Sequence, residues 1–269
     1  MEFHGVIPAI FTAFNADETL DIGALYALVD KLVGDGVHGV FVVGSQGEYY
    51  ALDAAEKRLA MKGAVRAASR RVPVFAGTGA NTNREAVELT RFAEAVGADA
   101  VSVLTPSYIA PGQEELYQRF HDVAASTRSP VLLYSSPGRT GVNVSASLVA
   151  RLARIDNIVG IKDSSGDLSV TAAYIAAAPP GFRVFARCGT LLFATLQHGG
   201  IGVVSACGNV VARHLVQFYA ACKACDIESA RSIQQELAPL REVFSLGTFP
   251  AAIYQGGATH DWPGCGPLP

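Results

Sequence analysis

Eight short runs of β-branched and other apolar residues recur along this chain of 269 residues. Most of them are apolar throughout and do not alternate with polar residues, which is the pattern of strands buried on both faces of a parallel sheet. The runs are residues 6–12, 39–43, 72–76, 100–104, 131–134, 158–161, 184–186 and 201–205. The sequence therefore predicts a parallel sheet of eight strands.

The segments between these runs carry apolar stripes at helical spacing. One stripe comprises Leu89, Phe92, Ala93 and Val96, and another, on residues 114–126, comprises Leu116, Phe120 and Val123. Asp53 and Glu56 have the spacing of a capping box at the start of a further helix. Strand alternating with helix eight times predicts an α/β fold of the closed (β/α)8 type, the TIM barrel.

A doubly wound open sheet is the alternative fold, with 77–79 (GTG) or 200–202 (GIG) as its nucleotide loop. Neither segment completes G-x-G-x-x-G, and that fingerprint should follow the first strand. After the eighth run, residues 210–243 look largely helical, and the Gly- and Pro-rich tail 247–269 has no helical period. We therefore expect a catalytic barrel over residues 1–209 and a short C-terminal helical extension with an irregular tail over 210–269.

The composition excludes two classes of protein. With 21 Lys and Arg against 24 Asp and Glu, the chain lacks the basic excess of a nucleic-acid-binding protein. Its 50% hydrophobic and 17% charged residues exclude a disordered chain. The first residues lack a signal-peptide pattern, and no apolar run approaches the ~20 residues that span a membrane. We expect a soluble, cytoplasmic, small-molecule enzyme without nucleic-acid or membrane partners.

The five cysteines form an odd and sparse set, which indicates reduced thiols. Cys222 and Cys225 make a CxxC within the Ala-rich segment 218–230. Because no second Cys pair or histidine pair accompanies them, a helix with two small buried thiols is favoured over a zinc or redox site. The six histidines show no HxH or HExxH spacing, so we expect no metal.

In a barrel of this type the chemistry lies at the C-terminal ends of the strands, and Lys162 directly follows the sixth run. The other four lysines fall in helical segments, where we expect solvated faces: Lys31, Lys57, Lys62 and Lys223. A lysine at the mouth of a packed barrel loses hydration, which favours the neutral amine that attacks a carbonyl to form a Schiff base. The equally weighted alternative is a structural ion pair with Asp163 or Glu48.

Further polar side chains follow neighbouring strands. Tyr134 ends the fifth run and could transfer a proton to or from an intermediate, or pack at the rim. The backbone N–H groups of Ser45 and Gln46, before Gly47 and a helix, could bind a carboxylate with help from the helix dipole, or form an ordinary turn. Arg139 in the loop 135–141 could hold a second carboxylate or lie on the surface.

Hydrolysis by two carboxylates is the rival chemistry on this fold, with Glu48 and Asp163 as candidates. Neither the fifth nor the seventh strand end supplies an acid, so this chemistry is disfavoured. Ser164 and Ser165, directly after Asp163, are interpreted as a turn with a helix N-cap.

Six segments together resemble the dihydrodipicolinate synthase / N-acetylneuraminate lyase family. They are 44–48 (GSQGE), 77–81 (GTGAN), 97–101 (GADAV), 105–108 (TPSY), 134–141 (YSSPGRTG) and 160–165 (GIKDSS). The match runs in order from about Gly5 to about Asn209. It implies a class I, pyruvate-handling lyase or aldolase on a (β/α)8 barrel with a C-terminal helical extension. No metal or cofactor is implied besides the covalent imine.

Within this family the chain looks most like the synthase branch. The resemblance makes Lys162 the Schiff-base lysine and Tyr134 the proton-transfer tyrosine, with Ser45 completing a relay. It makes Tyr108 a residue that reaches the partner's site in a homodimer or homotetramer, and Arg139 the anchor for the carboxylate of aspartate semialdehyde. Gln46, Gly47 and Val204 complete the residues expected to bind substrate, a 2-oxo acid with an aldehyde.

Three features differ from the synthase pattern. Gln46 replaces a second hydroxyl residue, and Ser135 stands where many members have asparagine, as in some aldolases acting on 4-hydroxy-2-oxo acids. The tail 249–269 resembles the family loosely and stops about one helix early. Two alternatives therefore stay open. One is an aldolase for a 2-keto-3-deoxy sugar acid or 4-hydroxy-2-oxoglutarate, and the other is a catalytically degenerate 2-oxo-acid-binding protein.

Overall fold

The computed structural model describes residues 2–253, and its centre is a parallel sheet of eight strands. The sheet order is β1-β8-β7-β6-β5-β4-β3-β2, and a parallel bridge between Ala9 and Phe41 joins β1 to β2. The strands are β1 Gly5–Pro8, β2 Val40–Val42, β3 Val74–Gly77, β4 Ala100–Leu104, β5 Val131–Ser135, β6 Ile158–Asp163, β7 Arg183–Ala186 and β8 Gly202–Ser205. All eight predicted strands are present, and the (β/α)8 prediction is confirmed.

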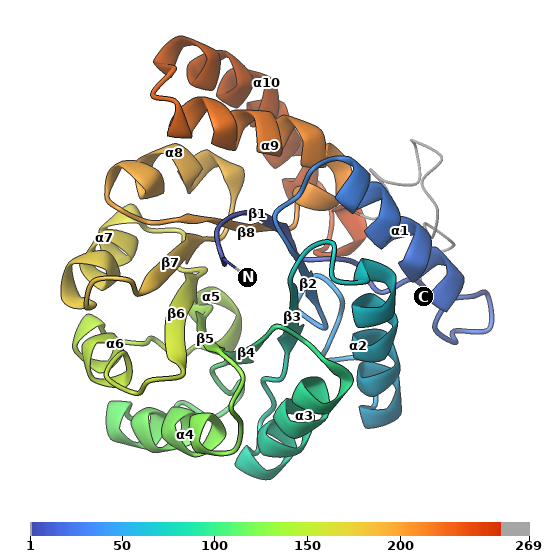
Figure 1. The fold of residues 1–269 in the computed structure, drawn as a ribbon, viewed down its shortest axis with the longest axis vertical. Coiled ribbons are helices and arrows are strands. Elements are labelled where there is room, and N and C mark those ends of the chain that lie inside the picture. Colours follow the sequence, from blue (N-terminus) through green and yellow to red (C-terminus); the bar gives the residue numbers. More distant parts are fainter. Residues whose placement is uncertain (1, 254–269) are drawn as a thin grey trace.

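Helices surround the strands, as Figure 1 shows. They are α1 Ile22–Gly34, α2 Ala54–Ala68, α3 Asn83–Val96, α4 Gln113–Ala125, α5 Pro137–Thr140, α6 Ala146–Leu152, α7 Leu168–Ala177, α8 Gly189–Gln197, α9 Gly208–Lys223 and α10 Ile227–Ser245. The predicted capping box opens α2, because the Asp53 side chain accepts from the Glu56 backbone and the Glu56 side chain accepts from the Asp53 backbone.

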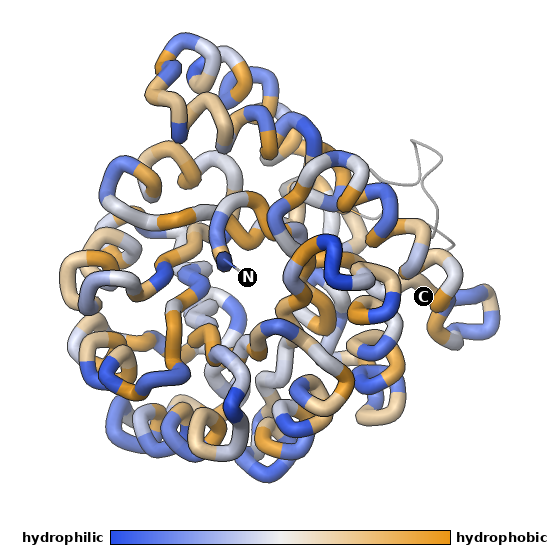
Figure 2. The backbone as a smooth tube through the Cα atoms, viewed as in Figure 1, coloured by the Kyte–Doolittle hydropathy of each residue, from blue (hydrophilic) through white to orange (hydrophobic). Residues whose placement is uncertain are grey.

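The apolar residues form a core inside the barrel and further cores between the strands and the helices. Inside the barrel, Phe41, Phe75, Leu132 and Phe185 are each at most 1% exposed. Figure 2 shows hydrophobic segments on the strands and hydrophilic ones on the outer helices. The interior of the barrel is therefore packed, and substrate can enter only at its mouth.

Gly77 and Gly79 belong to this packing and not to a nucleotide loop. A Cβ at Gly77 would collide with the carbonyl oxygen of Val43, and one at Gly79 would lie 2.6 Å from the backbone nitrogen of Leu104. Both positions require glycine because the neighbouring backbone passes too close for a side chain. The close packing of the backbone therefore explains the two glycines of residues 77–79, which the alternative open-sheet fold would have used as a nucleotide loop.

Helices α9 and α10 cover most of the stretch 210–243 that was predicted to be helical. The prediction of two buried thiols is half wrong. Cys222 is buried in α9, but Cys225 is exposed, with a φ of 58° in the turn after that helix. Residues 254–269, including Cys265 and most of the tail that departs from the family pattern, lie outside the described residues.

The prediction of a solvated face is also wrong for Lys57. Its side chain lies between α2 and α3, where it is only 8% exposed, and its Nζ is 3.0 Å from Glu85 Oε1. A long aliphatic stem can be buried when the ammonium at its end has a partner. Across residues 2–253, the structure contains no helix long and apolar enough to cross a membrane.

Candidate active site

Lys162 and Tyr134 lie side by side at the C-terminal ends of β6 and β5, where they are register partners. Lys162 is 4% exposed, and its Nζ lies 4.1 Å from the centroid of the Tyr134 ring and 4.7 Å from that of Phe41. The negative faces of the two rings attract an ammonium and compensate part of its lost hydration. The lysine predicted from sequence is therefore buried in an aromatic site inside the barrel.

Asp163 points to the other side of β6. Its carboxylate accepts hydrogen bonds from Thr171 Oγ1 at 2.6 Å and from the Ser165 backbone at 2.8 Å. Successive residues of a strand face opposite sides, so the carboxylate holds α7 while the amine faces the interior. Among the described residues, Lys162 has no ion pair with Asp163 or Glu48. The structural ion pair proposed for Lys162 is therefore not formed. Glu48 and Asp163, the two carboxylates that hydrolysis would require, are also absent from the described lining of the cavity.

The Tyr134 hydroxyl is placed for proton transfer, 3.3 Å from Ser45 Oγ. Burial raises the pKa of this phenol, but the Lys162 charge and hydrogen bonds with Ser45, Ser164 and Lys162 more than offset it and lower the pKa to about 8. By contrast, burial raises the pKa of Tyr49. Tyr134 is therefore prepared to exchange a proton near neutral pH.

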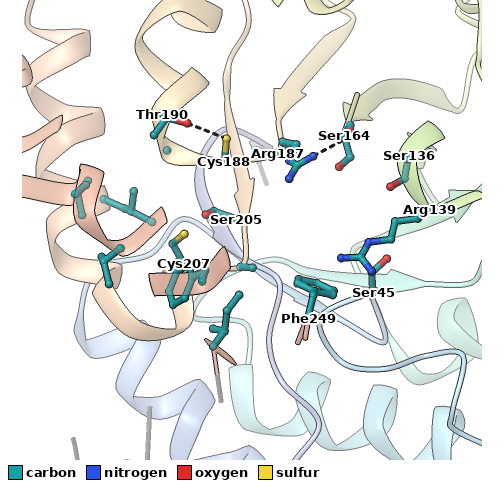
Figure 3. A pocket seen from close by; sticks show the side chains of 18 of the residues that line it. Ser45, Ser136, Arg139, Ser164, Arg187, Cys188, Thr190, Ser205, Cys207 and Phe249 are labelled. Atoms are coloured by element: carbon teal, nitrogen blue, oxygen red, sulfur yellow. Dashed lines mark hydrogen bonds between the residues drawn. The ribbon is translucent and has the colours of Figure 1, made fainter. Parts of the chain in front are cut away.

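A cavity of about 510 Å³ opens beside this pair (Figure 3). Its polar wall comprises Ser45, Tyr134, Ser136, Arg139, Ser164, Arg187, Thr190 and Ser205. The opposite wall is apolar and includes Leu215 of α9 and Leu237, Leu240 and Phe244 of α10. Lys162 does not itself line the cavity, whereas Tyr134 does, and the Lys162 amine lies 4.1 Å from the centroid of the Tyr134 ring.

Arg139 is held at the rim of this cavity by α5, which begins directly after β5. Its guanidinium carbon lies 4.2 Å from the centroid of the Phe249 ring. Stacking on one face leaves the N–H groups at the edge of the guanidinium available for a planar anion. Arg139 therefore lines the cavity with N–H groups able to bind a carboxylate, and its role as an anchor stays a prediction.

The loop between β2 and α2 differs from the expectation in two respects. Gln46 is 1% exposed, its side-chain amide has no hydrogen-bond partner among the described residues, and it does not line the cavity. Helix α2 begins only after its N-cap Asp53, so its dipole does not act at Ser45. The carbonyl of Gly47 accepts from Thr12 Oγ1 at 2.6 Å, which fixes the loop to the chain after β1.

Tyr108 and Val204 are not brought to the site within one chain. Tyr108 follows β4 with a φ of 73°, and its side chain is fully exposed. Val204 is 1% exposed in the core inside the barrel and does not line the cavity. Within this single chain, neither Tyr108 nor Val204 lines the cavity.

Ser164 and Arg187 are among the residues of the cavity wall that were not identified from the sequence. Ser164 was interpreted as a turn residue before an N-cap, but Asp167 caps α7, and Ser164 lines the cavity and is hydrogen-bonded to Tyr134. Arg187 directly follows β7. The strand-end rule that selected Lys162 would have selected Arg187 as well.

No group of three or more His, Cys, Asp or Glu side chains within residues 2–253 is arranged to hold a metal ion. The polar groups of the described cavity wall are mainly hydroxyls and guanidinium groups, with the thiols of Cys188 and Cys207, and the Lys162 amine lies 4.1 Å from the centroid of the Tyr134 ring. Such a set can bind carboxylates, form an imine and transfer protons.

The model of the dihydrodipicolinate synthetase family matches residues 2–264. The chain belongs to this family. It is 38% identical over 254 residues to the 4-hydroxy-tetrahydrodipicolinate synthase of Methanopyrus kandleri, covering 94% of this chain and 85% of the relative.

Two solved structures are also similar. A crystal structure of a dihydrodipicolinate synthase superposes with a TM-score of 0.95 at 35% identity, covering 99% of this chain and 92% of the other. The second is YagE, a prophage protein of E. coli K12 from the same family, solved in complex with pyruvate. It also has a TM-score of 0.95 at 35% identity, with the same coverage of 99% and 92%.

We expect an ultraviolet absorbance titration to detect one phenol that ionises at about pH 8. Burial raises the pKa values of Tyr49, Tyr50 and Tyr174, so they ionise later. The early transition should vanish in Tyr134→Phe and move to higher pH in Ser45→Ala, because that variant removes a hydrogen bond that favours the phenolate. An early transition that persists in Tyr134→Phe would contradict the assignment.

Proposed function

We propose that this chain is a class I lyase that forms an imine between Lys162 and pyruvate and condenses it with L-aspartate 4-semialdehyde. This is the activity in the name of its relative from Methanopyrus kandleri, 4-hydroxy-tetrahydrodipicolinate synthase. The observation that carries the proposal is the buried Lys162 amine, 4.1 Å from the centroid of the Tyr134 ring at the edge of a cavity. The pyruvate bound to YagE supports the choice of the 2-oxo acid.

The first half of the proposed reaction activates pyruvate. The Lys162 amine attacks the ketone carbon, and Tyr134 passes a proton to the departing oxygen, which leaves as water. Loss of a proton from the methyl carbon then gives an enamine. A phenol with a pKa of about 8 can give and take protons near neutral pH, and Ser45 at 3.3 Å extends the relay.

The second half of the reaction joins the two substrates. The enamine carbon attacks the aldehyde carbon, whose oxygen takes up a proton. The amino group of the semialdehyde then displaces Lys162 from the imine and closes the ring. Backbone N–H groups of the loop at Ser45, Gln46 and Gly47 hold the pyruvate carboxylate, and Arg139 holds that of the semialdehyde. Besides the covalent imine, this sequence of steps uses no cofactor.

The second candidate is an aldolase that cleaves a 2-keto-3-deoxy sugar acid or 4-hydroxy-2-oxoglutarate to pyruvate and an aldehyde. Gln46 favours it, because this residue replaces a hydroxyl of the synthase pattern and its buried side chain leaves Ser45 as the loop hydroxyl at Tyr134. Both candidates share the imine at Lys162 and differ in the acceptor.

Reduction with borohydride in the presence of pyruvate should leave a pyruvate-derived adduct on Lys162, detectable by peptide mass spectrometry. Lys57, which is buried but paired with Glu85, serves as the internal control and should stay unmodified. Lys162→Ala should lose adduct and turnover, whereas Tyr134→Phe should lower kcat by roughly 10²- to 10⁴-fold. Pyruvate binding without an adduct would instead indicate the degenerate, non-catalytic family member.

Arg139 distinguishes the synthase from an aldolase for uncharged aldehydes. We expect Arg139→Ala to lower kcat/KM for aspartate semialdehyde by about 10- to 100-fold, the usual effect of losing a charged hydrogen bond. Propanal, which has no carboxylate, should be affected little. The exposed Arg128→Ala is the matched control. Equal losses for both aldehydes would show that Arg139 acts through its packing on Phe249.

For Tyr108 we propose a contact with a second copy of the chain in a homodimer or homotetramer. Its ring is fully exposed beside the exposed Ile109, so this loop has apolar surface to bury. Sedimentation should detect an oligomer that Tyr108→Asp weakens, because the substitution places a charge in the contact. The control is Tyr50→Asp on the loop before α2, at another exposed tyrosine. An unchanged sedimentation coefficient in Tyr108→Asp would remove the proposal.

A further inference from the structure

The cavity carries more positive charge than the proposed reaction requires. Its described lining residues include Arg139 and Arg187 and no aspartate or glutamate. In the proposed reaction, the loop at Ser45 holds one carboxylate and Arg139 holds the other. Arg187 therefore has no assigned anion.

Arg187 is well placed to bind an anion. It directly follows β7, so its backbone is anchored at the mouth of the barrel. Its Nη1 makes one long hydrogen bond, 3.5 Å, to the carbonyl oxygen of Ser164, and the side chain is exposed. Within residues 2–253 it takes part in no ion pair. A guanidinium has five N–H donors, so this lining side chain keeps donors available for an anion in the cavity.

Figure 3 places the two guanidinium groups on different walls of the cavity, Arg187 beside Ser164 and Arg139 beside Ser45 and Phe249. Thr190 and Ser205 add hydroxyls to the cavity, which continues to the apolar wall of α10. A substituent that reaches Arg187 therefore has both polar partners and room. A group that branches from the end of the acceptor held by Arg139 can extend toward the wall that carries Arg187.

The charge of that second group decides how well it fits. Aspartate semialdehyde carries an ammonium on the carbon that bears its carboxylate, and an ammonium beside a guanidinium is repelled. A carboxylate on the same carbon would instead form a charge-assisted, bidentate pair. The described lining also contains no carboxylate that could neutralise an ammonium there.

We propose that Arg187 is a specificity-determining residue that binds a second carboxylate of the acceptor. The site then also catalyses aldol addition of pyruvate to aldehyde dicarboxylates, in which both carboxylates lie at the end remote from the aldehyde. This inference rests on the proposed imine chemistry at Lys162 and adds an acceptor class to it.

The reaction balances without a further reactant. Lys162 and pyruvate form the imine and release one water, and a proton leaves the pyruvate methyl carbon. The new carbon–carbon bond forms to the aldehyde carbon, and the aldehyde oxygen takes up a proton. Because the acceptor has no amino group, one water hydrolyses the imine. The products are free Lys162 and a 4-hydroxy-2-oxo acid with three carboxylates.

Three aldehydes with one common skeleton test the proposal, because only one substituent changes. On the carbon next to the carboxylate, succinate semialdehyde carries hydrogen, aspartate semialdehyde carries an ammonium and 2-(2-oxoethyl)malonate carries a second carboxylate. Consumption of pyruvate gives kcat/KM for each. In the unmodified protein, the dicarboxylate should exceed succinate semialdehyde by about 10-fold or more.

Arg187→Gln should reduce this preference by about 10- to 100-fold, the range for a lost charged hydrogen bond, while kcat/KM for succinate semialdehyde changes little. Arg187→Lys keeps the charge but not the bidentate geometry, so it should restore part of the preference. The matched control is Arg183→Gln at the other end of β7, where the guanidinium lies 5.8 Å from the centroid of the Phe3 ring. It should leave the preference unchanged.

Borohydride trapping of pyruvate on Lys162 is measured in every variant, so the two proposals fail in different ways. Absence of the adduct from the unmodified protein would refute the proposed imine function. A normal adduct with the same preference in Arg187→Gln would overturn only the role of Arg187. An equal loss of the preference for the dicarboxylate in Arg183→Gln would also overturn the role of Arg187, because the effect would then come from a disturbance of β7 as a whole.

Discussion

The site depends on one unfavourable placement, an amine buried inside a packed barrel. Removing the Lys162 ammonium from water is costly, and no carboxylate within the described residues neutralises it. The rings of Phe41 and Tyr134 and the Tyr134 hydroxyl compensate part of this lost hydration. The same arrangement lowers the pKa of the phenol to about 8, so the features that accommodate the amine also supply a group for proton transfer.

The barrel produces this arrangement through strand register. Lys162 pairs with Tyr134 across β5 and β6, and alternation directs Asp163 outward to Ser165 and Thr171. Gly160, two residues before Lys162, lets β6 approach β7, since a Cβ there would collide with the carbonyl oxygen of Arg183. A shift of one residue would exchange the amine and the carboxylate, so the chemistry requires this register.

Sequence reasoning succeeded where strand periodicity determines the position of a side chain. Lys162 and Tyr134 end buried strands, so their direction follows from the alternation of the strand. It was less successful for loops and helix faces, where tertiary contacts decide. Gln46 turns into the protein, Lys57 is buried against Glu85, and Ser164 bonds to Tyr134. The contacts of Lys57 and Ser164 have no local sequence signal, because Glu85 and Tyr134 are distant from them in the chain, and Gln46 has no polar partner among the described residues that could have marked it.

The amine with its tyrosine and the wall of the neighbouring cavity are built from different parts of the fold. Lys162 and Tyr134 are strand residues fixed by neighbouring strands on both sides. The side assigned to the acceptor in the proposed reaction is formed by α5, by Arg187 after β7, and by α10 and Phe249 of the C-terminal extension. In the proposed reaction, substitutions on the acceptor side should change the charge of the walls while strand register keeps the amine in place. We therefore propose that one imine-forming centre serves acceptors of different charge and that the charge of the walls selects among them.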